Sequence, residues 1–161
     1  MATLSDKQVG IRRALPADVG ALNQLRSETS GVFTPTRDLD RHLAEPGIYT
    51  YLAEHETPFG FVTVGPAIDL EHGGLGEVRE WFVSATYQKC GYGRKLLVHG
   101  LTVLKRGMCD SALIWLPVEL TRPLDVILKH GFKAYPAERI VNVAELSTTE
   151  QAYVKDLGDY F

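Results

Sequence analysis

The fold of this chain is decided by the stretch Val83–Leu97, VSATYQKCGYGRKLL, where a hydrophobic strand runs through a glycine turn into a leucine-rich helix. Gly91 and Gly93 allow the backbone to turn tightly and to approach a ligand closely. The N–H groups that open a helix lack intrahelical partners, so they favour an anion. Positive charge is added by Lys89, Arg94 and Lys95. The stretch therefore predicts a phosphate-binding turn.

Length and composition favour one soluble globular domain over residues 1–161, with 45% hydrophobic and 23% charged residues. A net charge of −3 argues against a broad nucleic-acid or membrane surface. No apolar run reaches about 18 residues and the start lacks signal-peptide features, so we expect a cytoplasmic protein. The two cysteines, Cys90 and Cys109, show no CxxC spacing, and the five histidines show no paired spacing. We therefore expect free thiols and no metal site.

The hydrophobic periods along the chain predict a mixed α/β domain in the order β, α, α, β, β, β, α, β, α, β, β. Strands are expected over 9–14, 48–53, 59–64, 77–83, 112–116, 132–135 and 139–146. Helices are expected after Pro16, over 38–44, from the glycine turn to Gly107 and over 124–130. Ser147–Glu150 resembles a capping box, which predicts a short terminal helix carrying Tyr153 and Leu157.

The glycine turn fits neither of two common nucleotide motifs. A Walker loop requires Lys-Ser or Lys-Thr after its last glycine, and a dinucleotide fingerprint requires a third glycine where Leu96 stands. The pattern V-x-x-x-x-[QR]-x-x-G-x-[GA] does fit, at Val83, Gln88, Gly91 and Gly93. In this placement it resembles the GNAT superfamily of acyl-coenzyme A dependent N-acyltransferases.

Two further segments carry the resemblance over nearly the whole chain. The opening IRRALPADVGAL, residues 11–22, looks like the first strand and helix of that family, and Lys129-His130-Gly131-Phe132 resembles its K-x-G-F. The resemblance implies a mixed, mostly antiparallel central sheet flanked by helices. It also implies that the strands splay around Val83 and Trp115 to form a coenzyme slot.

The family resemblance implies acetyl-coenzyme A (acetyl-CoA) as cosubstrate. The loop would bind its pyrophosphate through backbone N–H groups, and the end of the preceding strand would bind the pantetheine arm. The matching positions are Val83, Ser84, Gln88, Lys89, Cys90, Gly91, Tyr92, Gly93, Arg94 and Lys95.

Acylation of an amine needs a base that accepts the amine's proton. Glu77 and Glu80 precede the turn, and we expect them on opposite faces of their strand unless a bulge intervenes. Glu77 matches the catalytic glutamate of histone-acetylating members, whereas the EWFV segment resembles a [DE]FFV variant, which favours Glu80. In the alternative interpretation both carboxylates are ion-paired or solvated beside Arg79.

The general acid is where the chain departs from the family. Many members carry a tyrosine where this chain has Ile127, and an asparagine where it has Leu120. The thiolate would then take its proton from water or from the amine. A covalent acyl-enzyme on Cys90 is disfavoured, because a residue whose main chain holds pyrophosphate lies far from the thioester.

The sequence therefore favours an acetyl-CoA dependent N-acetyltransferase that acts by direct transfer in a ternary complex. The acceptor is a small-molecule amine or a protein amine, and a homodimer remains open. The alternative is a catalytically silent coenzyme-binding module of the same fold, motivated by Ile127 and Leu120.

Overall fold

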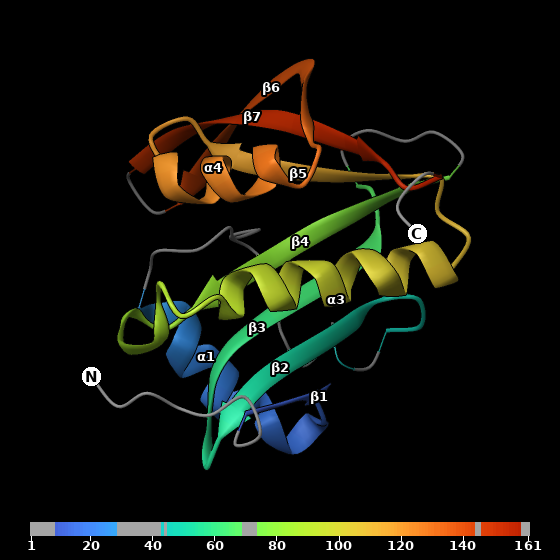
Figure 1. Cartoon of the computed structure of the whole chain (residues 1–161). Coiled ribbons are helices and arrows are strands. Elements are labelled where there is room, and N and C mark those ends of the chain that lie inside the picture. The colour runs from blue at the N-terminus through green and yellow to red at the C-terminus, as the bar shows by residue number, and fades with distance from the viewer. Residues whose placement is uncertain (1–8, 29–42, 44, 69–73, 144–145, 159–161) are drawn as a thin grey trace.

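One seven-stranded sheet organises the chain, in the order β1-β2-β3-β4-β5-β7-β6 (Figure 1). The computed structural model describes residues 9–28, 43, 45–68, 74–143 and 146–158. The strands are β1 (Gly10–Arg13), β2 (Tyr49–His55), β3 (Thr57–Pro66), β4 (Leu75–Val83), β5 (Ser111–Pro117), β6 (Lys133–Val143) and β7 (Leu146–Asp156). Neighbouring strands pair antiparallel except β4 and β5, which pair parallel. The expected mixed, mostly antiparallel sheet is confirmed.

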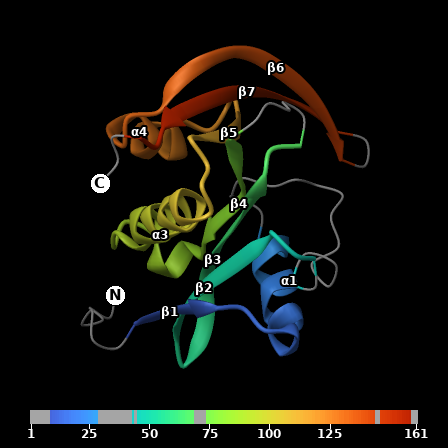
Figure 2. The same ribbon diagram turned by 90° about the vertical axis from the view of Figure 1, so that its right-hand side faces the viewer.

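Helices cover both faces of the sheet. They are α1 (Val19–Ser27), α3 (Tyr92–Arg106) and α4 (Thr121–Lys129). Figure 2 shows α3 and α4 on one side of the sheet and α1 on the other. On the α3 side, Val62, Val78 and Trp81 pack with buried leucines of α3, whereas Phe61 and Phe82 pack on the opposite side against α1. These contacts define the two faces used below.

The helix α3 lies unusually close to the sheet. A Cβ added at Gly100 would stand 3.0 Å from Val64 Cγ1 and 3.2 Å from Val62 Cγ2. The missing side chain therefore lets the middle of the helix approach β3 closely.

The sequence locates most elements within a few residues, but two expectations at the C-terminus are wrong. The two strands expected over 132–135 and 139–146 are joined in the single strand β6, Lys133–Val143, whose register shifts between Ala134 and Glu138. Residues 144–145 lie outside the described part of the chain, and Leu146 already belongs to β7. The expected terminal helix is the strand β7. The helix expected over 38–44 lies, apart from Leu43, outside the described residues.

The error at β7 has a physical cause. Ser147–Glu150 matches a capping box locally, but the segment lies between β5 and β6 and forms ladders with both. Within β7, Ala152 is buried in one cluster and the adjacent Tyr153 packs against another, as the alternating faces of a strand require. Tertiary pairing thus overrides the local helix signal.

Two irregularities occur at the centre of the sheet: a bulge in β4 and the end of pairing between β4 and β5. Thr63 pairs with Glu80 but Val64 pairs with Val78, so Arg79 is an extra residue in β4. Pairing between β4 and β5 ends at Val78 and Ile114. Beyond these two residues the strands separate, and the expected splay is confirmed.

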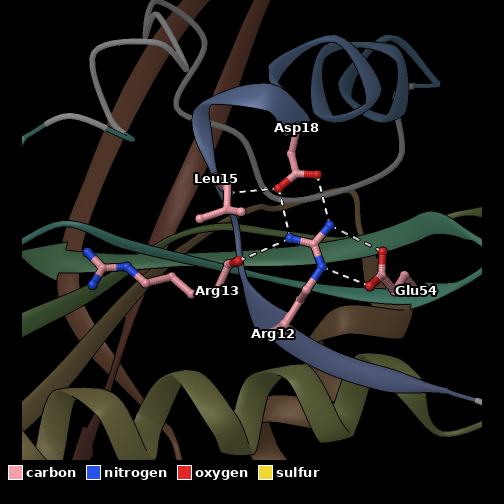
Figure 3. A network of polar contacts seen from close by, with 5 residues as sticks. All are labelled: Arg12, Arg13, Leu15, Asp18 and Glu54. Atoms are coloured by element: carbon pink, nitrogen blue, oxygen red, sulfur yellow. Dashed lines mark hydrogen bonds and ion pairs between the residues drawn. The ribbon is translucent and has the colours of Figure 1, made fainter.

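An ionic network fixes the chain leading into α1 (Figure 3). The Arg12 guanidinium on β1 donates to both carboxylate oxygens of Asp18, each at 2.9 Å, and to Glu54 of β2 at 2.7 Å. Asp18 Oδ2 also accepts the backbone N–H of Leu15 at 2.7 Å. The hydrogen bond from Arg12 holds the pKa of Asp18 below its usual value of 3.8. The network therefore joins β1, β2 and the start of α1.

We expect Asp18→Asn to destabilise the protein by about 1 kcal/mol at neutral pH, since it removes a partly exposed ion pair and weakens a cap. A carboxyl with a lowered pKa contributes its stability above its unfolded pKa and loses it as pH falls through the folded value. The gap to wild type should therefore be constant above pH 5 and close below about pH 4. Denaturant unfolding across pH 2 to 7 measures it, with exposed Glu138→Gln as control. A gap that does not narrow as the pH falls below about 4 would contradict the prediction.

Candidate active site

A cavity of about 650 Å³ opens where β4 and β5 separate. We call this cavity the slot. It is lined on the β4 side by Trp81, Phe82 and Val83, at the turn by Gln88, Lys89, Gly91, Gly93 and Arg94, and on the α4 side by Glu119, Leu120, Thr121, Arg122, Pro123, Asp125, Val126 and Lys129. The glycine turn and the first turn of α4 therefore face each other across it.

The backbone of β4 presents polar groups to the slot. Ser84 N–H donates to the Phe59 carbonyl at 2.8 Å, which makes these two residues a hydrogen-bonded pair. Because such pairs alternate along an antiparallel ladder, the N–H and C=O groups of Val83 and Trp81 point away from β3, towards the split. Val83 is thus placed to pair with an extended ligand. Ser84 is not, since its carbonyl also accepts from Tyr87 N–H at 2.9 Å.

The Gln88 side chain connects the two walls of the slot. Its Nε2 donates to the Val83 carbonyl at 3.0 Å, and its Oε1 accepts from Arg122 Nη1 of α4 at 3.1 Å. The Gln88 side chain therefore bridges the end of β4 and the start of α4. The sequence motif marked this position but gave no sign of the partner on α4.

The turn itself needs left-handed backbone at two positions. Lys89 has φ 65° and Gly91 has φ 87°. Gly91 caps α3, and the first helical hydrogen bond runs from Lys95 N–H to the Gly91 carbonyl at 3.1 Å. The N–H groups of the first three helical residues precede that bond and point out of the helix end. The start of α3 therefore presents three backbone N–H groups that have no partner within the helix.

The side chains of the turn divide into two groups. Lys89 and Arg94 line the slot, together with Arg122 and Lys129 from α4, so cationic groups stand on both walls. The remaining predicted binding residues, Ser84, Cys90, Tyr92 and Lys95, are not among the described residues that line it.

The buried aromatic residues at the turn are structural. Tyr92 is 4% exposed and packs edge-on against Phe59, with ring centroids 5.1 Å apart. The Trp81 indole N–H donates to the Gly93 carbonyl at 2.7 Å, which pins the first turn of α3 to β4. Cys90 is exposed, and its thiol contacts the Gln88 carbonyl at 3.6 Å.

The bulge at Arg79 brings both candidate carboxylates to one face. Val78 and Trp81 both pack on the α3 side, so Glu77 and Glu80, each adjacent to one of them, both face the α1 side. We call this the α1 face. The two carboxylates were expected on opposite faces unless a bulge intervened, and the bulge at Arg79 does intervene.

Both carboxylates are buried, but they have different partners. Glu80 is 0% exposed, and its Oε2 lies 3.0 Å from Arg26 Nε of α1. Glu77 is 1% exposed, and its Oε1 accepts the Ile68 N–H at 3.2 Å. Glu77 pairs with Leu113 in the closed part of the sheet, whereas Glu80 lies beyond the last β4–β5 pair.

A second buried ion pair stands on the other side of the split. Arg139 Nε of β6 lies 2.7 Å from Glu150 Oε1 of β7, and Glu150 is 3% exposed. The Arg139 guanidinium also stacks over the Trp115 ring of β5, 4.4 Å from its centroid. Trp115 belongs to a buried cluster with Leu113 and Ala152. Neither Arg26 nor Arg139 could be assigned to the site from sequence, because both come from distant segments.

The residue at the position of the family tyrosine, Ile127, is buried away from the slot. Ile127 is 0% exposed and belongs to the core formed by α3 and the sheet. The residue of α4 beside it that lines the slot is Val126. Among the described residues that line the slot there is no tyrosine or cysteine.

The chain matches the Acetyltransferase (GNAT) family over residues 20–132. It belongs to this family, whose cosubstrate is acetyl-CoA. The expected family, its fold and its cosubstrate are thereby confirmed. No curated protein sequence matches the chain.

Solved structures share the fold at low sequence identity. One is yncA from Salmonella typhimurium with its cofactor acetyl-CoA, at TM-score 0.76 and 19% identity, covering 94% of this chain and 95% of that chain. Another is Arabidopsis thaliana NAA60 in complex with a bisubstrate analogue, at TM-score 0.75 and 15% identity, covering 92% and 97%. A third is the ribosomal-protein-alanine N-acetyltransferase from Brucella melitensis, at TM-score 0.71 and 17% identity, covering 91% and 98%.

Among the described helices, none combines the length and the apolar character needed to cross a membrane. The cytoplasmic location stays a prediction from the sequence, and the question of a homodimer stays open.

Alanine substitutions at the two glycines of the turn distinguish the effect of backbone strain from the effect of an added side chain. A Cβ at Gly91 meets nothing within 4 Å but would sit on a residue with φ 87°, whereas a Cβ at Gly93 makes ordinary contacts of 3.7 Å or more. We expect Gly91→Ala to cost about 1 to 2 kcal/mol of left-handed strain and to weaken acetyl-CoA binding about tenfold. Gly93→Ala should bind within about twofold of wild type, since the family pattern also accepts alanine there.

Isothermal titration calorimetry with acetyl-CoA measures both variants. Equal affinities for Gly91→Ala and wild type would show that the left-handed turn does not shape the binding site.

Proposed function

We propose that this protein transfers an acetyl group from acetyl-CoA to a primary amine, by direct attack within a ternary complex. The observation that carries the proposal is the split between β4 and β5. The slot opens at the split on the α3 side, and the Glu80 carboxylate lies beside it on the α1 face. A coenzyme and an acceptor could thus meet from opposite faces of one sheet.

The residues of the slot fit a coenzyme A thioester. The outward N–H and C=O groups of Val83 suit the amide-containing pantetheine arm as an added strand. The N–H groups that open α3 suit a pyrophosphate, and Lys89, Arg94 and Arg122 supply charge around it. Binding at the Val83 carbonyl would replace the Gln88 amide that contacts it in this structure.

When bound, acetyl-CoA supplies an acetyl group activated as a thioester. The Trp81 backbone N–H points into the split two residues before Val83, where it could donate to the thioester carbonyl oxygen and stabilise developing negative charge. The Trp81 indole, held on Gly93, fixes that part of β4 relative to α3.

Glu80 is our candidate for the base. It lies past the last β4–β5 pair and on the α1 face, so it is closer to the open part of the sheet than Glu77. Its carboxylate would accept the proton of the attacking amine, directly or through one water. Arg26 orients this carboxylate from α1.

No side-chain acid is assigned to the leaving thiolate. The described lining of the slot contains no tyrosine, and Ile127 is packed in the core. We infer that the thiolate is protonated by water or by the proton released from the amine. A thiol is acidic enough to leave readily without a dedicated acid.

The acceptor is a small-molecule amine or a protein amine. The Brucella melitensis neighbour is by its name an enzyme acting on alanine of a ribosomal protein, which supports the second class as a candidate here. An acceptor screen on the intact chain distinguishes the two.

Two measurements test the proposed function. Calorimetric titration with acetyl-CoA tests the slot, and a thiol-release assay across small amines and peptides tests turnover. The absence of binding at millimolar coenzyme would refute the proposal. Binding without turnover across the panel would favour the catalytically silent module.

Paired substitutions separate the two carboxylates. We expect Glu80→Gln to lower kcat about a hundredfold or more at neutral pH, since it removes the proton acceptor but keeps an oxygen for Arg26. The coenzyme Kd should stay within about twofold, because Glu80 lies on the face opposite the slot. Glu77→Gln should change kcat far less.

Steady-state thiol release and coenzyme titration on both variants provide the test. The reverse ranking would assign the base to Glu77, and unchanged rates in both would remove a carboxylate base from the mechanism.

A further inference from the structure

The Trp115 indole N–H has no hydrogen-bond acceptor among the described residues. Trp115 is only 3% exposed, so the group is also shielded from bulk water. A buried donor without a partner costs about 1 to 3 kcal/mol, and such groups are rare in folded proteins. This donor is therefore expected to have a partner that the described residues do not supply.

Trp115 borders the split on the β5 side. It directly follows Ile114, the last residue of β5 that pairs with β4. Leu113, two residues before Trp115 in β5, points to the same face and packs with Leu75 on the side opposite α3. Trp115 and Glu80 thus lie on the same face, on the two strands that border the split.

The indole is held rigidly. The Arg139 guanidinium stacks over the ring, and the Glu150 carboxylate fixes Arg139 at 2.7 Å. Ala152, directly opposite Trp115 in β7, leaves room for the ring to lie over that strand. A buried ion pair is expensive to build, and this one has the effect of fixing the orientation of a donor.

We propose that the Trp115 indole N–H donates a hydrogen bond to an oxygen atom of the acceptor. The acceptor is then an amine that carries a carbonyl oxygen close to the reactive nitrogen, as in an amino-acid amide or the amino end of a peptide. A simple alkylamine would leave the donor unpaired and would bind more weakly. This inference rests on the proposed function, because it names the substrate class of the same site.

The chain offers two internal reporters for the test. It contains two tryptophans, Trp81 and Trp115, so a ¹⁵N-labelled sample gives two indole resonances, which Trp81→Phe assigns. Trp81 lines the slot and its N–H is bonded to Gly93, so its resonance reports on the coenzyme. The Trp115 resonance reports on the acceptor independently of turnover.

The probes are amino-acid amides such as glycinamide, each paired with an alkylamine of equal length such as propylamine, added to protein saturated with coenzyme A. We expect at least one amide to move the Trp115 resonance downfield and its paired alkylamine to leave it in place. Trp115→Phe keeps an aromatic ring under Arg139 but removes the donor. It should weaken binding of that amide about tenfold and leave coenzyme affinity within about twofold.

Four results are decisive. No movement of the Trp115 resonance with any amide, or equal movement with the paired alkylamines, would overturn the inference. A preference for amides that survives in Trp115→Phe would also overturn it. Failure of acetyl-CoA to move the Trp81 resonance would instead refute the proposed function, which keeps the two outcomes separate.

Discussion

The loss of pairing between β4 and β5 is the constraint on which the rest of the structure depends. Seven strands form one sheet, yet the ladder at its centre stops at Val78 and Ile114. Unpaired backbone groups inside a protein must find other partners. The outward N–H and C=O groups of Trp81 and Val83 are therefore left without strand partners, and the Gln88 side chain satisfies one of them, the Val83 carbonyl.

The bulge at Arg79 adds a second consequence at the same place. Without the extra residue, Glu77 and Glu80 would point to opposite faces, and only one could meet an acceptor. With it, both reach the α1 face, and the side chains on the α3 side stay in the core. Two kinds of polar group are thus separated within a single strand: the backbone groups of Trp81 and Val83 lie at its open edge, and the carboxylates of Glu77 and Glu80 lie on the α1 face.

The sequence predicted the turn and its neighbours well because the information there is local. Glycines at positive φ, a strand before them and an amphipathic helix after them are short-range features. What it could not predict depends on pairing between distant segments. The helix signal at Ser147–Glu150 lost to ladders with β5 and β6, and Arg26, Arg122 and Arg139 reach the site from elements far from the motif.

The Gln88 amide at the Val83 carbonyl has a consequence for solubility. An open strand edge in the middle of a sheet is a template on which another chain could add a strand and begin to aggregate. Gln88 occupies the hydrogen-bond acceptor that such a strand would use, and Arg122 holds the amide in place from α4. A small ligand can displace one side-chain hydrogen bond, but an intruding strand would also have to fit between the glycine turn and α4. The open edge of β4 is thus protected from pairing with a strand of another chain, while a small ligand could still reach it.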